Sequence, residues 1–398
     1  MEVSDRTGEI IRMLEPHMQF VPIPSRRVMW SLLELYKDIA KGSKLVSNLR
    51  RDKKLTGNLI PIQKKELESR LKGGSFLPKA IKEHIIDRTE HLLVYKVAVD
   101  SREISIEFGI TEGQLGHLDH YERYVDFIVC WLHVCGLYSQ GKCARSLKIC
   151  MFLTGYKKLL PHTTTTILGP MNVNTGYSYF CAPAGEMVLY RMEEWKKVLI
   201  HESFHAYGLD FSTSYNKMVE RMRGLFPVKS EFNISEAYTE TWARICNSVM
   251  CAYSCISGKP TEDKFIEAVQ FNIGVERMYA AIQCSKVLKY MGLDYESLID
   301  TTMHTSAIMR TNLFRENSNV LSYYIITAVL LSDYPQFLSW CRKHNTMLIK
   351  FRSTEKNYVS FGDLIEKQAK SQEFLDLLKS MKRINMNNSL TMSAIEGV

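Results

Sequence analysis

The strongest constraint on the fold is a change in the spacing of apolar residues near Arg191. Upstream, segments 91–98 and 104–108 are continuously apolar or alternate between apolar and polar residues, which is typical of β-strands. Downstream, apolar residues recur at helical spacing over most of the chain. Such a chain is expected to join a sheet to a mainly helical lobe in an α+β fold.

The segments upstream of Arg191 predict a mixed β-sheet. The two strands named above are expected to form a hairpin, followed by a helix at 117–137 and a buried strand at 147–153. Two extended segments, 172–179 and 187–190, flank a turn that contains proline and glycine, and they are expected to pair as a second hairpin. Because a helix separates some of the strands, the sheet should be mixed.

Helices are expected to dominate both ends of the chain. Near the N-terminus, residues 26–40 form an amphipathic pattern. Beyond Arg191, helical patterns lie near 192–208, 234–256, 262–291, 320–333 and 361–382. We therefore expect a helical, basic N-terminal region (1–88), a mixed-sheet lobe (89–210) and a helical lobe (211–398).

Composition predicts a globular protein of the cytoplasm. Of its 398 residues, 45% are hydrophobic and 24% are charged, as in ordinary globular chains. The first residues lack the pattern of a secretory signal, and no apolar run is long enough to span a membrane. Ten scattered cysteines without a Cys-x-x-Cys pair favour reduced thiols, so any metal is expected to bind histidines and carboxylates.

Positive charge is concentrated in segment 41–84, which has twelve Lys or Arg residues against four Asp or Glu residues. Such a segment can contact nucleic acid, an acidic protein or an anionic surface. The competing interpretation is a solvated charged face. The sequence has no recognisable nucleic-acid fold motif that would favour the first interpretation.

The residues that predict chemistry are His201, Glu202 and His205, in the pattern His-Glu-x-x-His. On a helix, His201 and His205 lie one turn apart on one face, so both imidazoles can reach a single ion. Glu202 lies about 100° round from His201, within reach of a water on that ion. The competing interpretation is an amphipathic helix that contains two histidines by chance.

A catalytic zinc ion usually takes three protein ligands, so a third is required. Glu236 and Glu240 begin a predicted helix and share one of its faces. Asn233 or Ser235 is suited to capping the start of this helix. The two carboxylates are therefore candidates for the metal site, although paired charges on a helix surface are also common.

This order of motifs resembles gluzincin peptidases, in which His-Glu-x-x-His is followed by Glu-x-x-x-Asp/Glu on the next helix. The resemblance implies a zincin-like fold, a Zn²⁺ cofactor and a peptide or protein substrate. It also implies that Glu236 is the third zinc ligand, Glu202 the catalytic base and Glu240 a carboxylate that orients a ligand imidazole. The 30 residues between His205 and Glu236 imply an extra loop across 211–232.

A rival ligand set follows from Gly208, which stands where metzincin peptidases have a glycine. The third ligand of that family would follow closely, but Phe211 occupies its place. Asp210 lies one residue too early, so a site of two histidines and Asp210 would need an altered turn.

Two further groups of residues are candidates for substrate chemistry. Tyr323 and Tyr324 are candidate donors to the oxyanion that forms during peptide hydrolysis. In gluzincins an edge strand beside the zinc helix pairs with the substrate, so Asn172, Asn174 and Tyr177 are expected to line the cleft. A structural turn rich in Asn and Gly is the alternative for the latter segment.

The stretch 168–211 also resembles uncharacterised metalloproteins of large DNA viruses. That resemblance implies a protein packaged in, or built into, a virus particle. In that setting the alternative to a peptidase is a catalytically silent protein of zincin fold with a structural role, whose contacts include other virion components.

Overall fold

The computed structural model of the protein describes residues 3–20, 22, 24–71, 74–211, 216–256, 261–384 and 387–397. The chain folds into two units, each built from separate stretches of sequence. The sheet unit contains residues 34–157 and 174–209, and the helical unit contains residues 1–33, 158–173 and 210–398. The expected α+β class is confirmed, since a mixed sheet and many helices are present.

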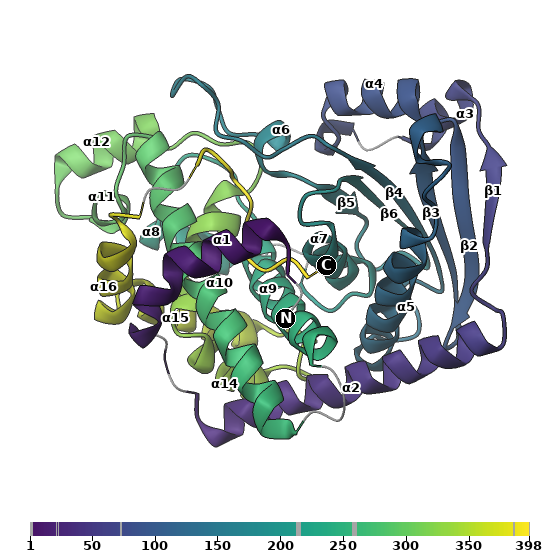
Figure 1. The fold of residues 1–398 in the computed structure, drawn as a ribbon. Coiled ribbons are helices and arrows are strands. Elements are labelled where there is room, and N and C mark those ends of the chain that lie inside the picture. The colour runs from purple at the N-terminus through teal and green to yellow at the C-terminus, as the bar shows by residue number, and fades with distance from the viewer. Residues whose placement is uncertain are drawn as a thin grey trace. The chain divides into compact units, whose positions relative to one another are not determined.

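The sheet unit is built on six strands in the order β1-β2-β3-β4-β6-β5 (Figure 1). The strands are β1 (Gly57–Pro61), β2 (His91–Val99), β3 (Arg102–Ile110), β4 (Ser146–Thr154), β5 (Gly176–Ser178) and β6 (Ala184–Arg191). β4 runs parallel to β3 and to β6, and the other neighbouring pairs are antiparallel. Both predicted hairpins, β2 with β3 and β5 with β6, are confirmed.

Helices cover both faces of this sheet. They are the C-terminal part of α2 (Arg26–Arg51), α3 (Lys64–Arg70), α4 (Lys79–Arg88), α5 (His120–Tyr138) and α7 (Trp195–Ala206), with the short turns η2 (Gly74–Phe76) and η3 (Glu112–Gln114). On one face, α3 and α4 pack into a cluster that includes Phe152, Tyr177 and Tyr190. Gly176, the neighbour of Tyr177 along β5, faces the other side and meets Val198 of α7.

The helical unit contains the remaining helices (Figure 1). They are the first part of α2, α1 (Asp5–Leu14), η1 (Glu15–Phe20), α6 (Pro170–Val173), α8 (Asn216–Leu225), α9 (Ile234–Cys255), α10 (Glu262–Tyr290), α11 (Tyr295–Ile299), α12 (His304–Leu313), the π-helix η4 (Leu321–Ile326), α13 (Thr327–Ser332), α14 (Tyr334–His344), α15 (Glu355–Ala369) and α16 (Gln372–Met381). Helices α9 and α10 contact each other and are buried along most of their length.

The C-terminal segment is anchored inside the helical unit. Glu276 of α10 is buried, and its carboxylate accepts hydrogen bonds from the backbone N–H groups of Ala394 and Ile395, at 2.9 Å each. Asn247 of α9 donates to the carbonyl of Ile395 at 2.7 Å. These backbone donors satisfy Oε1 of the buried carboxylate and so offset part of the cost of burying it.

Three features of the fold differ from the expectations. Segment 172–179 is not one strand, since α6 ends at Val173 and β5 begins only at Gly176. Residues 34–88 belong to the sheet unit, because β1 pairs with β2. Within the expected loop 211–232, residues 212–215 lie outside the described residues and α8 follows directly after them.

The described residues contain no helix that is both long enough and apolar enough to span a bilayer. The expectation that all thiols are reduced is wrong for Cys143 and Cys181, which form a disulfide. Because the two cysteines are 38 residues apart in the chain, the sequence alone does not indicate that they lie close together.

Candidate metal centre

Helix α7 presents two imidazoles on one face, as the spacing of His201 and His205 predicted. Their Nε2 atoms are 3.3 Å apart, and the planes of the two rings are 76° from each other. The His201 side chain is buried and the His205 side chain is half-buried. Two imidazole nitrogens that converge in this way suit a shared cation, since neutral imidazole is a common metal ligand.

The C-terminal end of α7 is fixed by a Schellman motif. Gly208, at φ +62°, donates to the carbonyl of His205 at 3.0 Å, and Leu209 donates to the carbonyl of Phe204 at 2.9 Å. The N–H of Cys181 reaches the same His205 carbonyl at 2.9 Å. Gly208 therefore ends a helix, and this requirement accounts for the glycine that suggested a metzincin.

Glu202 follows His201 on α7, and a serine holds its carboxylate. The hydroxyl of Ser178 donates to Oε2 of Glu202 at 2.7 Å, and the carboxylate is buried. The same hydroxyl lies 3.1 Å from the Glu202 carbonyl. Because Ser178 is the last residue of β5, the sheet itself sets the direction of this carboxylate.

Glu236 lies in the first turn of α9, and a tyrosine from η4 holds its carboxylate. The hydroxyl of Tyr323 donates to Oε2 of Glu236 at 3.0 Å. Asn233 caps α9 by accepting from the N–H of Ser235 at 3.1 Å. Its own N–H donates to Oδ1 of Asn319, 3.0 Å away, which ties the start of α9 to the chain just before η4.

The segment that carries Tyr323 is a π-helix, and a carboxylate accepts hydrogen bonds from backbone N–H groups at its start. Glu316 accepts hydrogen bonds from the backbone N–H groups of Val320 at 2.8 Å and Leu321 at 3.2 Å. Burial raises the pKa of Glu316, although these donors oppose that rise. Short π-helical segments are frequent at functional sites, and this one directs Tyr323 toward Glu236.

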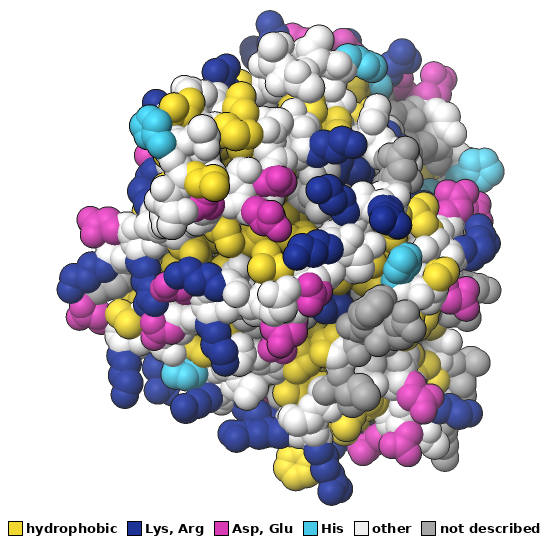
Figure 2. Space-filling model, turned by 90° about the vertical axis from the view of Figure 1, so that its left-hand side faces the viewer, with side chains coloured by type: hydrophobic (Ala, Val, Ile, Leu, Met, Phe, Trp, Pro, Cys, Tyr) yellow, Lys and Arg dark blue, Asp and Glu magenta, His cyan; other side chains and the backbone are white. Residues whose placement is uncertain are grey.

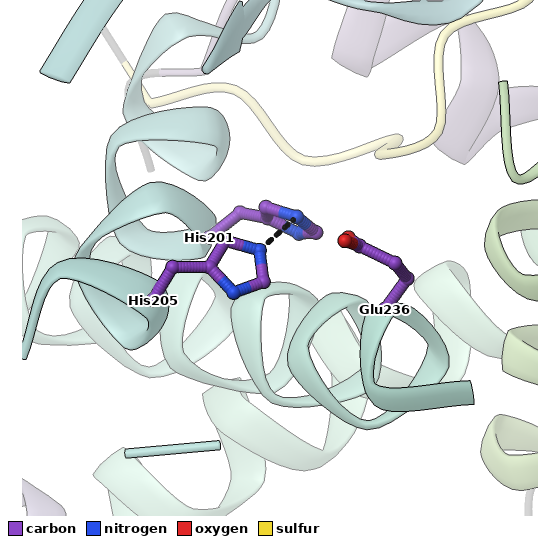
Figure 3. Close-up of side chains that lie close together, drawn as sticks. All are labelled: His201, His205 and Glu236. Carbon is purple, nitrogen blue, oxygen red and sulfur yellow. Dashed lines mark hydrogen bonds between the residues drawn. The ribbon is translucent and has the colours of Figure 1, made fainter. Parts of the chain in front are cut away.

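His201, His205 and Glu236 form a group that can hold a metal ion (Figure 3). Each residue offers one ligand atom, and these atoms all lie within 4.8 Å of one another. The close-up shows both imidazoles directed toward the Glu236 carboxylate. Two nitrogen donors and one oxygen donor match the ligand chemistry of zinc sites, although other transition metals accept the same set.

Glu240, expected to orient a ligand imidazole, forms an ion pair with Arg244 one turn along α9. Their side chains are 1% exposed, and the Nε to Oε1 distance is 3.0 Å. Arg244 also reaches the carbonyl of Tyr323 at 3.4 Å. Loss of either partner would leave the other charge buried without compensation, so Glu240 contributes to the stability of α9. Its expected role toward an imidazole stays a prediction.

Several other candidate residues have structural roles. Tyr324 is buried and donates to the carbonyl of Leu390, so it is a core residue. Asn172 lies in α6, where its amide donates to the Leu159 carbonyl at 3.0 Å. Tyr177 belongs to the core beneath α3 and α4, and its expected place in a cleft stays a prediction.

Asn174 and Asp210 are the two remaining candidate residues. The carbonyl of Asn174 accepts from Nε of Arg191 at 2.9 Å, just before β5 begins. Asp210 is buried and accepts from Thr239 of α9 at 3.2 Å. Among the described residues, the group that could hold a metal ion contains Glu236 and not Asp210.

The basic segment 41–84 carries charges that are largely paired. The cations with carboxylate partners are Lys41, Arg50, Arg51, Lys54, Lys64, Arg70 and Lys79. Residues 72 and 73 lie outside the described part of this segment. This pairing is typical of a solvated charged face, and a nucleic-acid or acidic partner for the segment stays a prediction.

Sequence reasoning missed Ser178 and did not separate Tyr323 from Tyr324. Ser178 was part of a predicted strand, but no local pattern indicates which helix side chain a strand residue meets. Comparison of the chain with protein-family models, with curated proteins and with solved structures gives no match.

Proposed function

We propose that the protein is a zinc-dependent peptidase of zincin-like fold, with His201, His205 and Glu236 as metal ligands. The observation that carries this proposal is the group of three ligand atoms within 4.8 Å of one another. The buried carboxylate of Glu202, next to His201 on the same helix, supplies a base beside that group. Zinc, when bound, lowers the pKa of a coordinated water and polarises a substrate carbonyl.

Glu202 acts as the general base in this proposal. It accepts a proton from the water that attacks the peptide carbonyl, and it then delivers this proton to the amine of the leaving product. The bond from Ser178 keeps one carboxylate oxygen engaged, so the other oxygen is available for proton transfer. Fixing the rotamer of a base in advance reduces the cost of reaching the transition state.

Tyr323 has two roles consistent with its position. Its bond to Glu236 orients the ligand carboxylate, as partners of metal ligands commonly do. In the second role, the single proton of this phenol would move from Glu236 to the oxyanion that develops on the substrate carbonyl. The hydroxyl of Tyr324 donates to the Leu390 carbonyl in the core, so neither role is proposed for Tyr324.

The substrate proposed is an extended peptide. β5 is the last strand in the order of the sheet, and it pairs with β6 on one side. Edge strands of this kind bind extended peptides by adding a strand through backbone hydrogen bonds. Since Ser178 ends β5 and contacts Glu202, a peptide paired with β5 is brought toward the proposed base.

The decisive experiment compares Glu202→Gln with Glu236→Gln in the full chain. Zinc content is measured by plasma emission spectrometry, and peptidase activity by mass spectrometry of a mixed peptide library. Glu202→Gln should retain one equivalent of zinc and lose nearly all cleavage, whereas Glu236→Gln should lose zinc and activity together.

Two results would contradict the proposal. Cleavage by Glu202→Gln at the wild-type rate would remove the base from the mechanism. Stoichiometric zinc without zinc-dependent cleavage of any library peptide by the wild-type chain would instead favour the catalytically silent alternative.

A further inference from the structure

A second site candidate lies in the helical unit, where a cavity of about 810 Å³ opens at the C-terminal end of α10. Its walls come from the last turns of α10, the start of α11, residue Met309 of α12, and α16 with the residues that follow it. The volume falls within the range of pockets that bind small molecules. None of the metal-site residues lines this cavity.

The apolar part of the cavity is aliphatic. Its lining includes Ile282, Leu288, Leu293, Leu375, Leu378 and Met381. Tyr295 is the aromatic residue of the lining, and its hydroxyl already donates to the carbonyl of Ala369 while its ring packs edge-on against Phe374. The walls therefore suit a flexible hydrocarbon chain better than a flat base that would stack on an exposed ring.

The charged part of the cavity is mainly cationic. Its five cations are Lys286, Lys289, Lys379, Lys382 and Arg383, and its two acids are Asp294 and Glu296. Asp294 is already engaged, since it caps α11 by accepting from the N–H of Ser297 at 2.8 Å. Within the described part of the chain, no ion pair is formed by any of the five cations. Figure 2 shows Lys and Arg side chains gathered beside hydrophobic side chains on one face of the molecule.

Lys286 places one of these charges inside the cavity wall. Its side chain is half-buried, and its ammonium donates to the carbonyl of Ser389 at 2.8 Å. Burial, assisted by the nearby charge of Arg6, lowers the pKa of Lys286 to about 8. An anion bound beside this ammonium would compensate for the lost hydration and the repulsion.

We propose that this cavity binds a small anionic amphiphile, with its aliphatic chain against the leucine-rich wall and its carboxylate or phosphate head among the five cations. The aliphatic lining, the volume and the excess of cations over acids together define this chemistry. The site is separate from the proposed peptidase centre, so it stands whether or not that activity is found.

Calorimetric titration of the full chain tests the proposal with dodecanoate and dodecyl phosphate below their micellar concentrations. Dodecanol carries the same tail without charge, acetate and inorganic phosphate carry a head without the tail, and ATP tests a nucleotide. Both dodecyl anions should bind with one-to-one stoichiometry. Each control ligand should bind at least about tenfold more weakly.

Charge variants then locate the site. Lys289→Glu/Lys382→Glu changes two exposed side chains and should weaken binding of dodecanoate at least about tenfold without altering the fold. Lys343→Glu/Lys356→Glu reverses the same number of charges at exposed lysines of α14 and α15 outside the cavity, so it is the matched control and should bind like the wild type.

Three outcomes would overturn the proposal. The first is equal binding of dodecanol and dodecanoate, which indicates adsorption to any apolar surface. The second is equal weakening by the control variant Lys343→Glu/Lys356→Glu. The third is association only with phosphatidylglycerol vesicles and not with the free amphiphile, which would assign the cations to a membrane surface.

Discussion

At the scale of single residues, the hydroxyl of Ser178 decides which way the Glu202 carboxylate points. Ser178→Ala removes that bond and leaves the carboxylate free to rotate. If Glu202 is the base, peptidase activity should fall about 10- to 100-fold, with zinc content unchanged. Steady-state kinetics and metal analysis on the same preparation measure both quantities.

A control for this substitution lies on α7 itself. The hydroxyl of Ser203 is buried and donates to the carbonyl of Leu199 at 2.7 Å, so its hydrogen bond stays within α7. Ser203→Ala should therefore keep the activity. Equal losses from the two alanine variants would mean that the contact between Ser178 and Glu202 has no special part in the reaction.

Adjacent tyrosines provide a second comparison at this scale. Tyr323→Phe removes the donor to Glu236, so zinc affinity should fall about 10- to 100-fold. Tyr324→Phe removes a core hydrogen bond and should cost about 1 kcal/mol of unfolding free energy without changing zinc affinity. Competition with a chromophoric chelator and urea unfolding measure the two effects. Weaker zinc binding by both variants alike would contradict the orienting role of Tyr323.

At the scale of elements, the end of α7 depends on a left-handed residue. Gly208→Ala places a side chain at φ +62°, and its Cβ would meet Sγ of Cys143 at 3.0 Å. The left-handed conformation alone costs about 1 to 2 kcal/mol, so the unfolding free energy should fall by at least this amount. Urea denaturation provides the measurement.

Gly224 in α8 is the matched control for this substitution. Its position is exposed, and an added Cβ meets nothing within 4 Å. Gly224→Ala should stabilise the protein by about 0.5 to 1 kcal/mol, because alanine favours a helix. If Gly208→Ala is as stable as the wild type, the Schellman motif does not hold this helix end.

The elements that were predicted from the sequence are those that a pattern within a short stretch of residues determines. The hairpin of β2 and β3 follows from two neighbouring apolar strands, and the spacing of His201 and His205 follows from helical geometry. Helices α9 and α10 were predicted to within one residue at each end, since long periodic segments carry a strong signal.

The features that escaped prediction depend on contacts between distant residues. β1 is exposed along its length and carries no buried pattern, so only its pairing with β2 reveals it. Ser178 acquires a role only because β5 lies against α7, and Tyr323 is separated from Tyr324 only by the turn of a π-helix. Local sequence patterns contain none of this information.

At the scale of the whole molecule, the cysteines differ in oxidation state. Cys143 and Cys181 form a disulfide, and the other eight cysteines are not disulfide-bonded. Seven of the eight are buried, and burial raises the pKa of Cys130, Cys150 and Cys284 to about 12. Since the thiolate is the reactive form, these thiols should be inert in the native state.

Alkylation with iodoacetamide followed by mass spectrometry tests this distribution. In the native protein, Cys255 should react first, because its side chain is only half-buried. Denaturation without a reductant should label eight cysteines, and reduction should raise the number to ten. Ten labelled residues before reduction would mean that the protein, as prepared, has no disulfide.

The disulfide should also contribute to global stability, because it closes a loop across 38 residues of the chain. By the loop-closure argument, Cys143→Ser/Cys181→Ser should lower the unfolding free energy by roughly 3 to 4 kcal/mol. Cys255→Ser, which breaks no disulfide, is the control and should cost much less. Unfolding in urea with and without reductant separates the effect of the disulfide from the effect of the substitutions themselves. The wild type should be weakened by reductant to the level of the double variant, whereas equal stability in both conditions would show that the crosslink does not hold the sheet unit together.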